Sequence, residues 1–168
     1  MWAMQANAIW AAYWFLVFLL QRPSDYKRVA AEVDAAQSKW TAAHPDTPLT
    51  SSNFGQFMVE TADHYPLISS GIQETLRLRT SSFSIRQVTT PTEFGGFMFN
   101  VNDELICNTR SIHMDPEVHE KPYDFILDRY TDSSKKYTKN GVAISNHSLP
   151  FGGGVSMCEG RYDFPEVS

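Results

Sequence analysis

The sequence has few cysteines, no excess of positive charge and no apolar run long enough to span a bilayer. Only Cys107 and Cys158 occur among 168 residues, too few for a disulfide framework or for a zinc site of four cysteines. The 14 Lys and Arg are outnumbered by 19 Asp and Glu, for a net charge of −5. No basic stripe is present, so we expect no nucleic-acid partner.

A signal peptide and a membrane span are not expected either. Met1 is followed by no basic region and no cleavage site of small residues. Gln5 and Asn7 interrupt the apolar pattern, so the apolar run from Ala8 to Leu20 has 13 residues, whereas a bilayer span needs about 20. Residues 2–21 are apolar on every face of a helix, which predicts a helix buried in a core.

The apolar periodicity changes along the chain from helical to strand-like. It predicts helices over residues 2–21 and 24–43, a weaker helical segment over 54–64 and a strong helix that opens at Pro66. From Ser82 onward the period is two, with a turn at Asn102 and Asp103 and a turn-rich stretch after Pro122. The fold class is therefore mainly α with small β-hairpins, an α+β fold rather than a repeating βαβ unit.

A run of three glycines, residues 152–154, precedes Cys158. No lysine followed by serine or threonine comes after it, so it is not a phosphate-binding P-loop. A nucleophilic cysteine needs a base, and nothing in the sequence ties His113 or His147 to this thiol. The remaining interpretation is a thiolate metal ligand, with glycines that let backbone amides approach the sulfur.

The glycine run also fits the pattern FxxGxxxCxG, through Phe151, Gly154, Cys158 and Gly160. This pattern resembles the haem-binding loop of cytochrome P450 enzymes. The resemblance implies that these four residues bind the cofactor haem b, iron protoporphyrin IX. It also implies that the Cys158 thiolate is the axial ligand of the iron.

Two further motifs stand upstream in the order typical of that family. Glu74 and Arg77 resemble its ExxR motif, and a PxxFxxxR segment is formed by Pro122, Phe125 and Arg129. The resemblance implies a structural charge network of Glu74, Arg77 and Arg129, in which arginines hold the carboxylate. Arg86 is similar to the family's arginine that binds a haem propionate.

The first helix is similar to the family's distal helix over the haem, although it departs from the usual pattern. It reads QANAIWAA and lacks the acid–alcohol pair that delivers protons. This stretch resembles the branch that contains sterol 7α-hydroxylases and prostacyclin synthase. Asn7 is the candidate catalytic residue facing the haem; the alternative is an amide that finds its partners inside the core.

Two other residues have simpler interpretations. His113, in a stretch that follows a strand in the family, is expected to make a structural hydrogen bond rather than to act at the haem. Cys107 is expected to be a small buried apolar residue of a strand.

The resemblance implies that residues 1–168 are the carboxy-terminal part of a cytochrome P450 domain. It implies that the amino-terminal half and the last helix are absent, because YDFPEVS does not fit a helix. The parent enzyme would insert one oxygen atom from O2 into a lipophilic, sterol- or lipid-like small molecule, with electrons from NADPH-cytochrome P450 reductase. It would lie on the cytoplasmic face of the endoplasmic reticulum membrane, and this chain has no anchor of its own.

Two alternatives to the monooxygenase stay open. The missing alcohol of the distal helix is compatible with a haem-thiolate isomerase of lipid peroxides, which needs neither O2 nor a reductase. A non-catalytic product of a truncated gene is the other alternative, since half of the haem pocket's walls would be missing.

Overall fold

The computed structural model describes residues 2–154 and 157–160, with side chains from Asn7 onward. The described elements are helices and three two-stranded antiparallel sheets, which confirms the predicted fold class. The predicted irregular end at YDFPEVS lies outside the described residues. The chain divides into two compact units, the first formed by residues 1–75 with 125–135 and the second by 76–124 with 136–167.

From Asn7 onward, the first helix, α1 (Trp2–Leu20), buries one of its faces. Its buried residues are Ala11, Phe15, Phe18 and Leu19. Large apolar residues at other positions stay exposed, namely Ile9, Trp10, Tyr13, Leu16 and Leu20. The prediction of a helix buried on every side was therefore wrong, because burial on all faces requires neighbours on all faces. Within the described part of the chain, no helix is long and apolar enough to cross a membrane.

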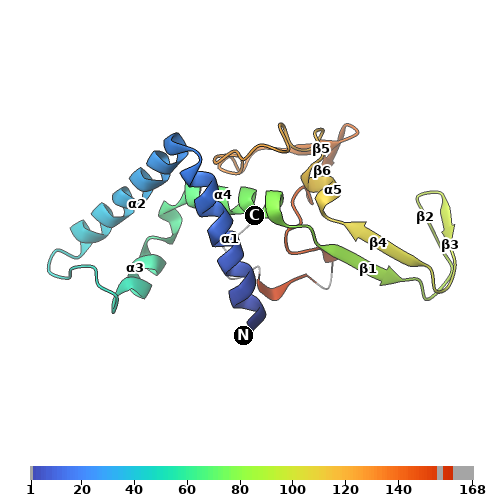
Figure 1. The fold of residues 1–168 in the computed structure, drawn as a ribbon, viewed down its shortest axis with the longest axis horizontal. Helices are drawn as coiled ribbons and strands as arrows, with labels where there is room; N and C mark the ends of the chain where they lie inside the picture. Colours follow the sequence, from blue (N-terminus) through green and yellow to red (C-terminus); the bar gives the residue numbers. More distant parts are fainter. Residues whose placement is uncertain (1, 155–156, 161–168) are drawn as a thin grey trace. The chain divides into compact units, whose positions relative to one another are not determined.

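Pro23 starts the second helix, α2 (Pro23–Ala43), close after the end of α1. A shorter helix, α3 (Phe54–Glu60), lies beside α2 and is followed by the 3-10 turn η1 (Ala62–His64) (Figure 1). Trp40 of α2 contacts Phe57 of α3 edge to face, with ring centroids 5.7 Å apart. The helical segment that we predicted over residues 54–64 is thus present, divided into the helix α3 and the 3-10 turn η1.

The helix α4 (Pro66–Arg79) begins at Pro66, as predicted. Proline suits this first position because it has no N–H to leave without a partner. The next two amides, of Leu67 and Ile68, donate to the carboxylate of Glu32 on α2 at 2.7 and 3.0 Å. A carboxylate from a separate helix therefore caps the positive end of α4.

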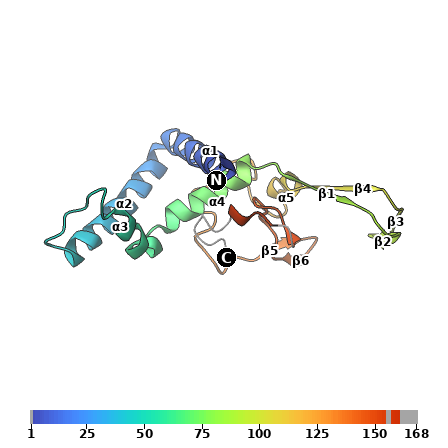
Figure 2. The same cartoon turned by 90° about the horizontal axis from the view of Figure 1, so that it is seen from below.

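The second unit contains a two-stranded ribbon of β1 (Phe83–Gln87) and β4 (Glu104–Asn108). The strands β2 (Thr92–Phe94) and β3 (Phe97–Phe99) form a hairpin at the tip of this ribbon (Figure 2). The strands on either side of the predicted turn at Asn102 therefore pair with other strands and not with each other. Cys107 is exposed on β4, which makes the prediction of a buried cysteine wrong.

Three more elements complete the second unit. The short helix α5 (Arg110–His113) follows β4. A third hairpin is formed by β5 (Tyr137–Lys139) and β6 (Val142–Ile144). Its turn contains Asn140 and Gly141, both with positive φ, which is typical of a two-residue hairpin turn. The segment that carries Cys158 follows this hairpin.

Candidate functional site

One face of α4 holds the segment 125–130 in the first unit. Glu74 accepts a hydrogen bond on Oε1 from Nε of Arg129 at 2.9 Å and another from the amide of Ile126 at 3.2 Å. One turn earlier on α4, Ser70 accepts from the amide of Tyr130 at 2.9 Å. The side chains of Arg129 and Glu74 are 2% and 0% exposed, so this ion pair is buried. It fixes the predicted PxxFxxxR segment to the helix of the ExxR motif.

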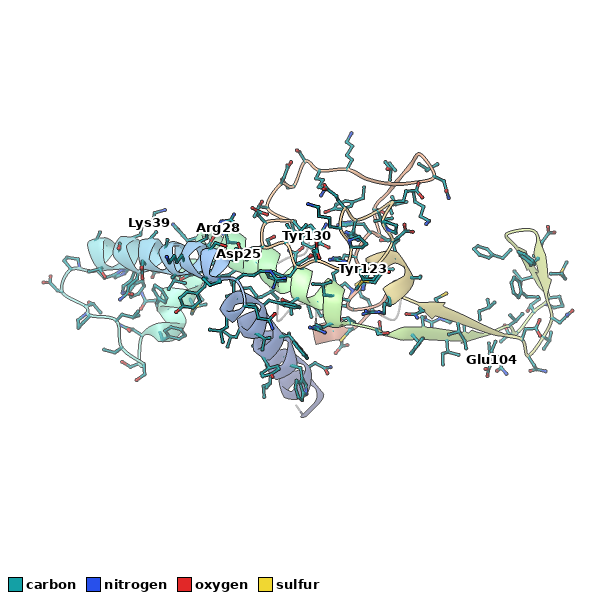
Figure 3. The ribbon with its side chains drawn as sticks, turned by 45° about the horizontal axis from the view of Figure 1, so that its top comes forward. Asp25, Arg28, Lys39, Glu104, Tyr123 and Tyr130 are labelled. Carbon is teal, nitrogen blue, oxygen red and sulfur yellow. The ribbon has the colours of Figure 1, made fainter. Side chains whose placement is uncertain are left out.

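A second ion pair of the first unit is exposed. Arg28 of α2 contacts Asp25 at 3.4 Å and Asp128 at 2.7 Å. Figure 3 shows Asp25 and Arg28 on the helix and Tyr130 on the segment that Arg28 reaches through Asp128. Because both partners of the longer-range pair are more than 40% exposed, water screens their attraction.

Arg77 is fully buried and binds backbone oxygens of the second unit. Its Nη1 donates to the carbonyls of His113 and Pro122, each at 2.6 Å. Its Nη2 lies 3.4 Å from the carbonyl of Asp124. The planar guanidinium presents several donors in a fixed fork, which suits three acceptors that converge on one point. Arg77 thus holds the polypeptide from α5 to the residues before Phe125.

The cysteine loop follows from Leu149 to Cys158. Gly152 and Gly154 have φ of 78° and 75°, a backbone conformation that a side chain disfavours. The amide of Gly152 donates to the carbonyl of Leu149 at 3.1 Å, and the amide of Cys158 donates to the carbonyl of Phe151 at 3.0 Å. Cys158 is an exposed thiol. The loop therefore turns back on itself and presents one sulfur to its surroundings.

Two histidines of the second unit contact the start of this loop. The side chain of His113 accepts a hydrogen bond from the amide of Leu149, and the Nε2 of His119 lies 2.9 Å from the carbonyl of His147. Burial, together with the positive charges of Arg77 and Arg110, lowers the pKa of His113 to about 4. His113 is therefore neutral at physiological pH and makes the structural hydrogen bond that the sequence predicted.

Asn7 and Arg86, two further residues that the sequence predicted for the site, take no part in the contacts described above. Asn7 is exposed on α1, in the first unit. Arg86 is exposed on β1 in the second unit, where its Nη1 donates to the carbonyl of Ile85 at 2.9 Å. Their roles at a haem stay predictions.

Sequence reasoning missed several residues that support the site. These are Ser70, His119, Tyr137 and His147. Ser70 lies four residues before Glu74, so helical spacing could have placed it on the same face. The contacts of the other three residues depend on tertiary structure, so no local sequence pattern predicts them.

Comparison with known proteins identifies the family. The sequence profile of the family described as Cytochrome P450 matches residues 1–162. The chain belongs to the cytochrome P450 family. It is 33% identical to the 25-hydroxycholesterol 7-alpha-hydroxylase of Rattus norvegicus over 96% of its length and 40% of that relative. It is 31% identical to the 7-alpha-hydroxycholest-4-en-3-one 12-alpha-hydroxylase of Homo sapiens, over 96% of this chain and 33% of that P450.

Solved P450 structures share the fold. A zebra fish cytochrome P450 with progesterone matches 92% of this chain with a TM-score of 0.65 and 23% identity. The retinoic acid-bound cyanobacterial CYP120A1 matches 91% with a TM-score of 0.66 and 23% identity. In both cases the chain covers 31% of the solved P450. The chain thus has the fold of part of a P450 domain, and it resembles the sterol 7-alpha-hydroxylase branch of the family.

Enzymes of the P450 family are oxidoreductases that carry haem b with a cysteine thiolate ligand. The donor chemistry of the cysteine loop fits this cofactor. A thiol is the soft ligand that such an iron centre uses, and Cys158 is exposed at the end of a loop with little side-chain bulk. An added Cβ at Gly152 or Gly154 meets nothing within 4 Å, so it is the positive φ that favours glycine there.

Proposed function

We propose that Cys158 is the axial thiolate ligand of haem b and that the chain is the haem-ligating part of a P450 monooxygenase. The observation that carries the proposal is the position of the exposed Cys158 sulfur at the end of a loop that contains Gly152 and Gly154. The amide of Cys158 donates to Phe151, and this bond fixes the backbone next to the ligand. Phe151 and Gly160 are proposed to border the cofactor.

The axial thiolate supplies electron density to the haem iron, which favours cleavage of the O–O bond. The chain's own contribution is to hold the sulfur in place and to keep side chains away from it. Positive φ at Gly152 and Gly154 allows the backbone to curve around the ligand. Arg86 is proposed to bind a haem propionate, because its guanidinium is exposed on β1 and suits a carboxylate.

The buried charges have a scaffolding role in this proposal. Glu74 and Arg129 tie the segment 125–130 to α4, and Arg77 ties the segment 113–124 to the same helix. We therefore propose that Glu74, Arg77 and Arg129 each hold, within their own unit, polypeptide that precedes the cysteine loop. None of the three needs to touch the cofactor.

The proposed reaction of the whole protein is the insertion of one oxygen atom from O2 into a sterol-like substrate. The names of two relatives support this class, because each describes a hydroxylase of a cholesterol-derived compound. The chain spans 40% and 33% of those two relatives, so other parts of a protein of that kind also shape the pocket. We infer that NADPH-cytochrome P450 reductase supplies the electrons at the cytoplasmic face of the endoplasmic reticulum membrane.

The test compares the two cysteines of the chain. Cys158→Ser in the full-length protein is expected to abolish the red-shifted Soret band of the reduced carbon monoxide complex. Cys107→Ser is the matched control and is expected to leave that band unchanged, since Cys107 is exposed on a strand of the ribbon. A thiolate-type band that survives Cys158→Ser but is lost in Cys107→Ser would show that the ligand is Cys107, and the proposal would be wrong.

The isomerase of lipid peroxides is a second candidate, favoured by the composition of α1. Its first turns carry Gln5 and Asn7 and no alcohol that could pass protons to bound oxygen. Purified full-length protein is expected to hydroxylate a sterol with NADPH and reductase. Turnover of a lipid hydroperoxide without NADPH, together with no hydroxylation in its presence, would establish the isomerase instead.

A further inference from the structure

Two fully buried histidines stand six residues apart on α5 and on the turn that follows it. His113 and His119 are both 0% exposed. The turn between them is closed by the amide of His119, which donates to the carbonyl of Asp115 at 2.8 Å. Both imidazoles use their Nε2 atoms to contact the backbone of residues 147–149, where the cysteine loop starts.

The contact of His113 determines which of its nitrogens carries the proton. The amide of Leu149 is a donor, and its nitrogen lies 2.8 Å from Nε2 of His113. That Nε2 must therefore accept, so it carries no hydrogen. In the neutral ring the proton then sits on Nδ1.

The contact of His119 requires the opposite arrangement. Its Nε2 lies 2.9 Å from the carbonyl oxygen of His147, and a carbonyl oxygen can only accept. The proton of this ring must therefore sit on Nε2. Two histidines that lie close in sequence thus bind neighbouring peptide groups as complementary tautomers, one as acceptor and the other as donor.

The side chain of His147 fixes the same position from another direction. Its ring stacks on that of Tyr137, with centroids 3.7 Å apart and planes inclined by 11°. Tyr137 lies on β5 and is 7% exposed. The start of the loop is therefore held by hydrogen bonds to its backbone and by packing of a side chain.

These contacts continue by hydrogen bonds to the cysteine. The carbonyl of Leu149, whose amide binds His113, accepts from the amide of Gly152 at 3.1 Å. Phe151, inside that turn, accepts from the amide of Cys158 at 3.0 Å. On the other side, the carbonyl of His113 is held by Arg77 at 2.6 Å. A series of bonds therefore runs from α4 through His113 to the backbone of Cys158.

We propose that His113 and His119 form a histidine clamp, two positioning residues in opposite tautomers that fix residues 147–149 and thereby the presentation of Cys158. The clamp itself is a property of the folded chain. Its effect on an axial ligand rests on the function proposed above. Neither histidine is proposed to touch the cofactor or a substrate.

The chemistry of the clamp predicts which substitutions preserve it. Glutamine places an amide group near the position of Nε2 and can present either its oxygen as acceptor or its nitrogen as donor. His113→Gln and His119→Gln are therefore expected to retain the clamp. Leucine fills a similar space but offers no polar atom, so His113→Leu leaves the amide of Leu149 buried without its partner.

The first test is hydrogen exchange measured on peptides that cover residues 147–151 in the full-length, haem-loaded protein. His113→Leu is expected to accelerate exchange of the Leu149 amide about tenfold or more, because an amide that has lost its acceptor also loses the protection of that hydrogen bond. His113→Gln is expected to stay within a few fold of the wild type. Unchanged exchange in a folded His113→Leu variant would overturn the clamp.

A matched control separates the clamp from general destabilisation. Thr61→Val in the first unit also removes a buried hydrogen bond, which runs from the threonine hydroxyl to the carbonyl of Phe57 at 2.7 Å. It is expected to leave exchange at residues 147–151 unchanged. An equal acceleration in Thr61→Val would show that the loop responds to any loss of stability, and the clamp would be rejected.

The second test needs no substitution, so it remains decisive if the leucine variants fail to fold. Imidazole 15N chemical shifts of the diamagnetic reduced carbon monoxide complex distinguish protonated from unprotonated ring nitrogens. His113 is expected to show an unprotonated Nε2 and His119 a protonated one. The same tautomer at both residues would overturn the proposal.

The effect of the clamp on the axial ligand is measured separately, by the carbon monoxide band of the reduced protein. His113→Leu and His119→Leu are expected to lose part of the thiolate-type carbon monoxide band, and both glutamine variants to keep it. If the exchange and tautomer results hold while Cys158→Ala leaves that band intact, the clamp stands and the proposed ligand is wrong. If the band depends on Cys158 but the tautomers are identical, the ligand stands and the clamp is wrong.

Discussion

Nε of Arg129 lies 2.9 Å from Oε1 of Glu74, and water reaches almost none of either side chain. Removing one partner of such a pair leaves the other charge buried without compensation, at a cost of about 3–5 kcal/mol. Glu74→Gln is therefore expected to lower the free energy of unfolding by that amount, measured by denaturant titration.

The exposed pair of Arg28 and Asp128 is the control for this prediction. It has a shorter contact, 2.7 Å, but both side chains are more than 40% exposed. Arg28→Gln is expected to cost about 1 kcal/mol or less. Equal losses in Glu74→Gln and Arg28→Gln would contradict the assignment of the first pair as the buried structural contact.

Replacing Arg77 with lysine is expected to be severe although it keeps the charge. A single ammonium cannot reproduce the fork that reaches the carbonyls of His113, Pro122 and Asp124. We expect a loss of several kcal/mol, on the scale of broken buried charged hydrogen bonds. Arg110→Lys is the control, because the guanidinium of Arg110 donates to the carbonyl of Leu78 at 3.2 Å rather than to several converging carbonyls. It is expected to unfold at nearly the denaturant concentration of the wild type.

The stability of the protein is expected to fall with acidification because of His113. Burial, together with the charges of Arg77 and Arg110, lowers its pKa from 6.5 to about 4 in the folded state. The unfolded state then binds more protons between these values, so stability is complete above about pH 6.5 and is lost as the pH falls toward 4. The loss amounts to as much as about 3 kcal/mol, at 1.36 kcal/mol per pKa unit.

His113→Gln removes this titration and keeps a polar group at the site. Denaturant titrations of the variant are expected to show a flatter pH dependence between pH 4 and 6.5 than those of the wild type. The same slope in both proteins would mean that His113 does not control acid stability.

Neighbouring glycines of the cysteine loop are expected to differ in their tolerance of alanine. Gly154 has φ of 75°, where a non-glycine residue costs about 1–3 kcal/mol. Gly153 has no positive φ, and an added Cβ would lie 3.6 Å from the side chain of Leu149, an ordinary contact. Gly154→Ala should reduce haem retention after gel filtration, and Gly153→Ala should not. The reverse ranking would show that the loop does not hold this conformation around the haem.

Two helical glycines provide a further pair. A Cβ at Gly71 on α4 would lie 2.4 Å from an atom of Phe15 and 2.8 Å from one of Leu127. Gly71→Ala is therefore expected to destabilise by about 1–3 kcal/mol through overpacking. Gly55→Ala on α3 meets nothing within 4 Å and is expected to stabilise by roughly 0.5–1 kcal/mol. Thermal unfolding of the two variants in parallel tests the contrast, and a stabilised Gly71→Ala would refute the close approach of α1.

The sequence predicted the helices well because their periodicity and their start signals are local. Pro66 begins α4 as expected, and the resemblance of Glu74 and Arg77 to the ExxR motif implied a structural network before any contact was known. The pairing of the strands could not be deduced in the same way. The strands on either side of Asn102 are adjacent in sequence, yet each has a different partner, since pairing depends on the hairpin inserted at Gly95 and Gly96.

The proposed ligand of the candidate site was indicated by the sequence, whereas the contacts that support the loop were not. Four fixed positions of one motif indicated Cys158. The opposite tautomers of His113 and His119 depend on which backbone group each ring meets, and those groups lie 28 or more residues away in the chain. Likewise, the composition of α1 predicted burial on every side, although only neighbours in space can provide it.

The hydrogen bonds from Arg77 to carbonyl oxygens have a consequence for how residues 113–124 can evolve. A guanidinium that binds main-chain oxygens is indifferent to the side chains that hang from them, so substitutions between His113 and Asp124 leave its three acceptors in place. Insertion or deletion of a single residue there shifts those acceptors out of reach. The bonds of Arg77 therefore constrain the length of this segment and not its side chains, whose constraints come from other contacts such as those of His113 and His119. We expect related sequences to keep the number of residues between His113 and Asp124.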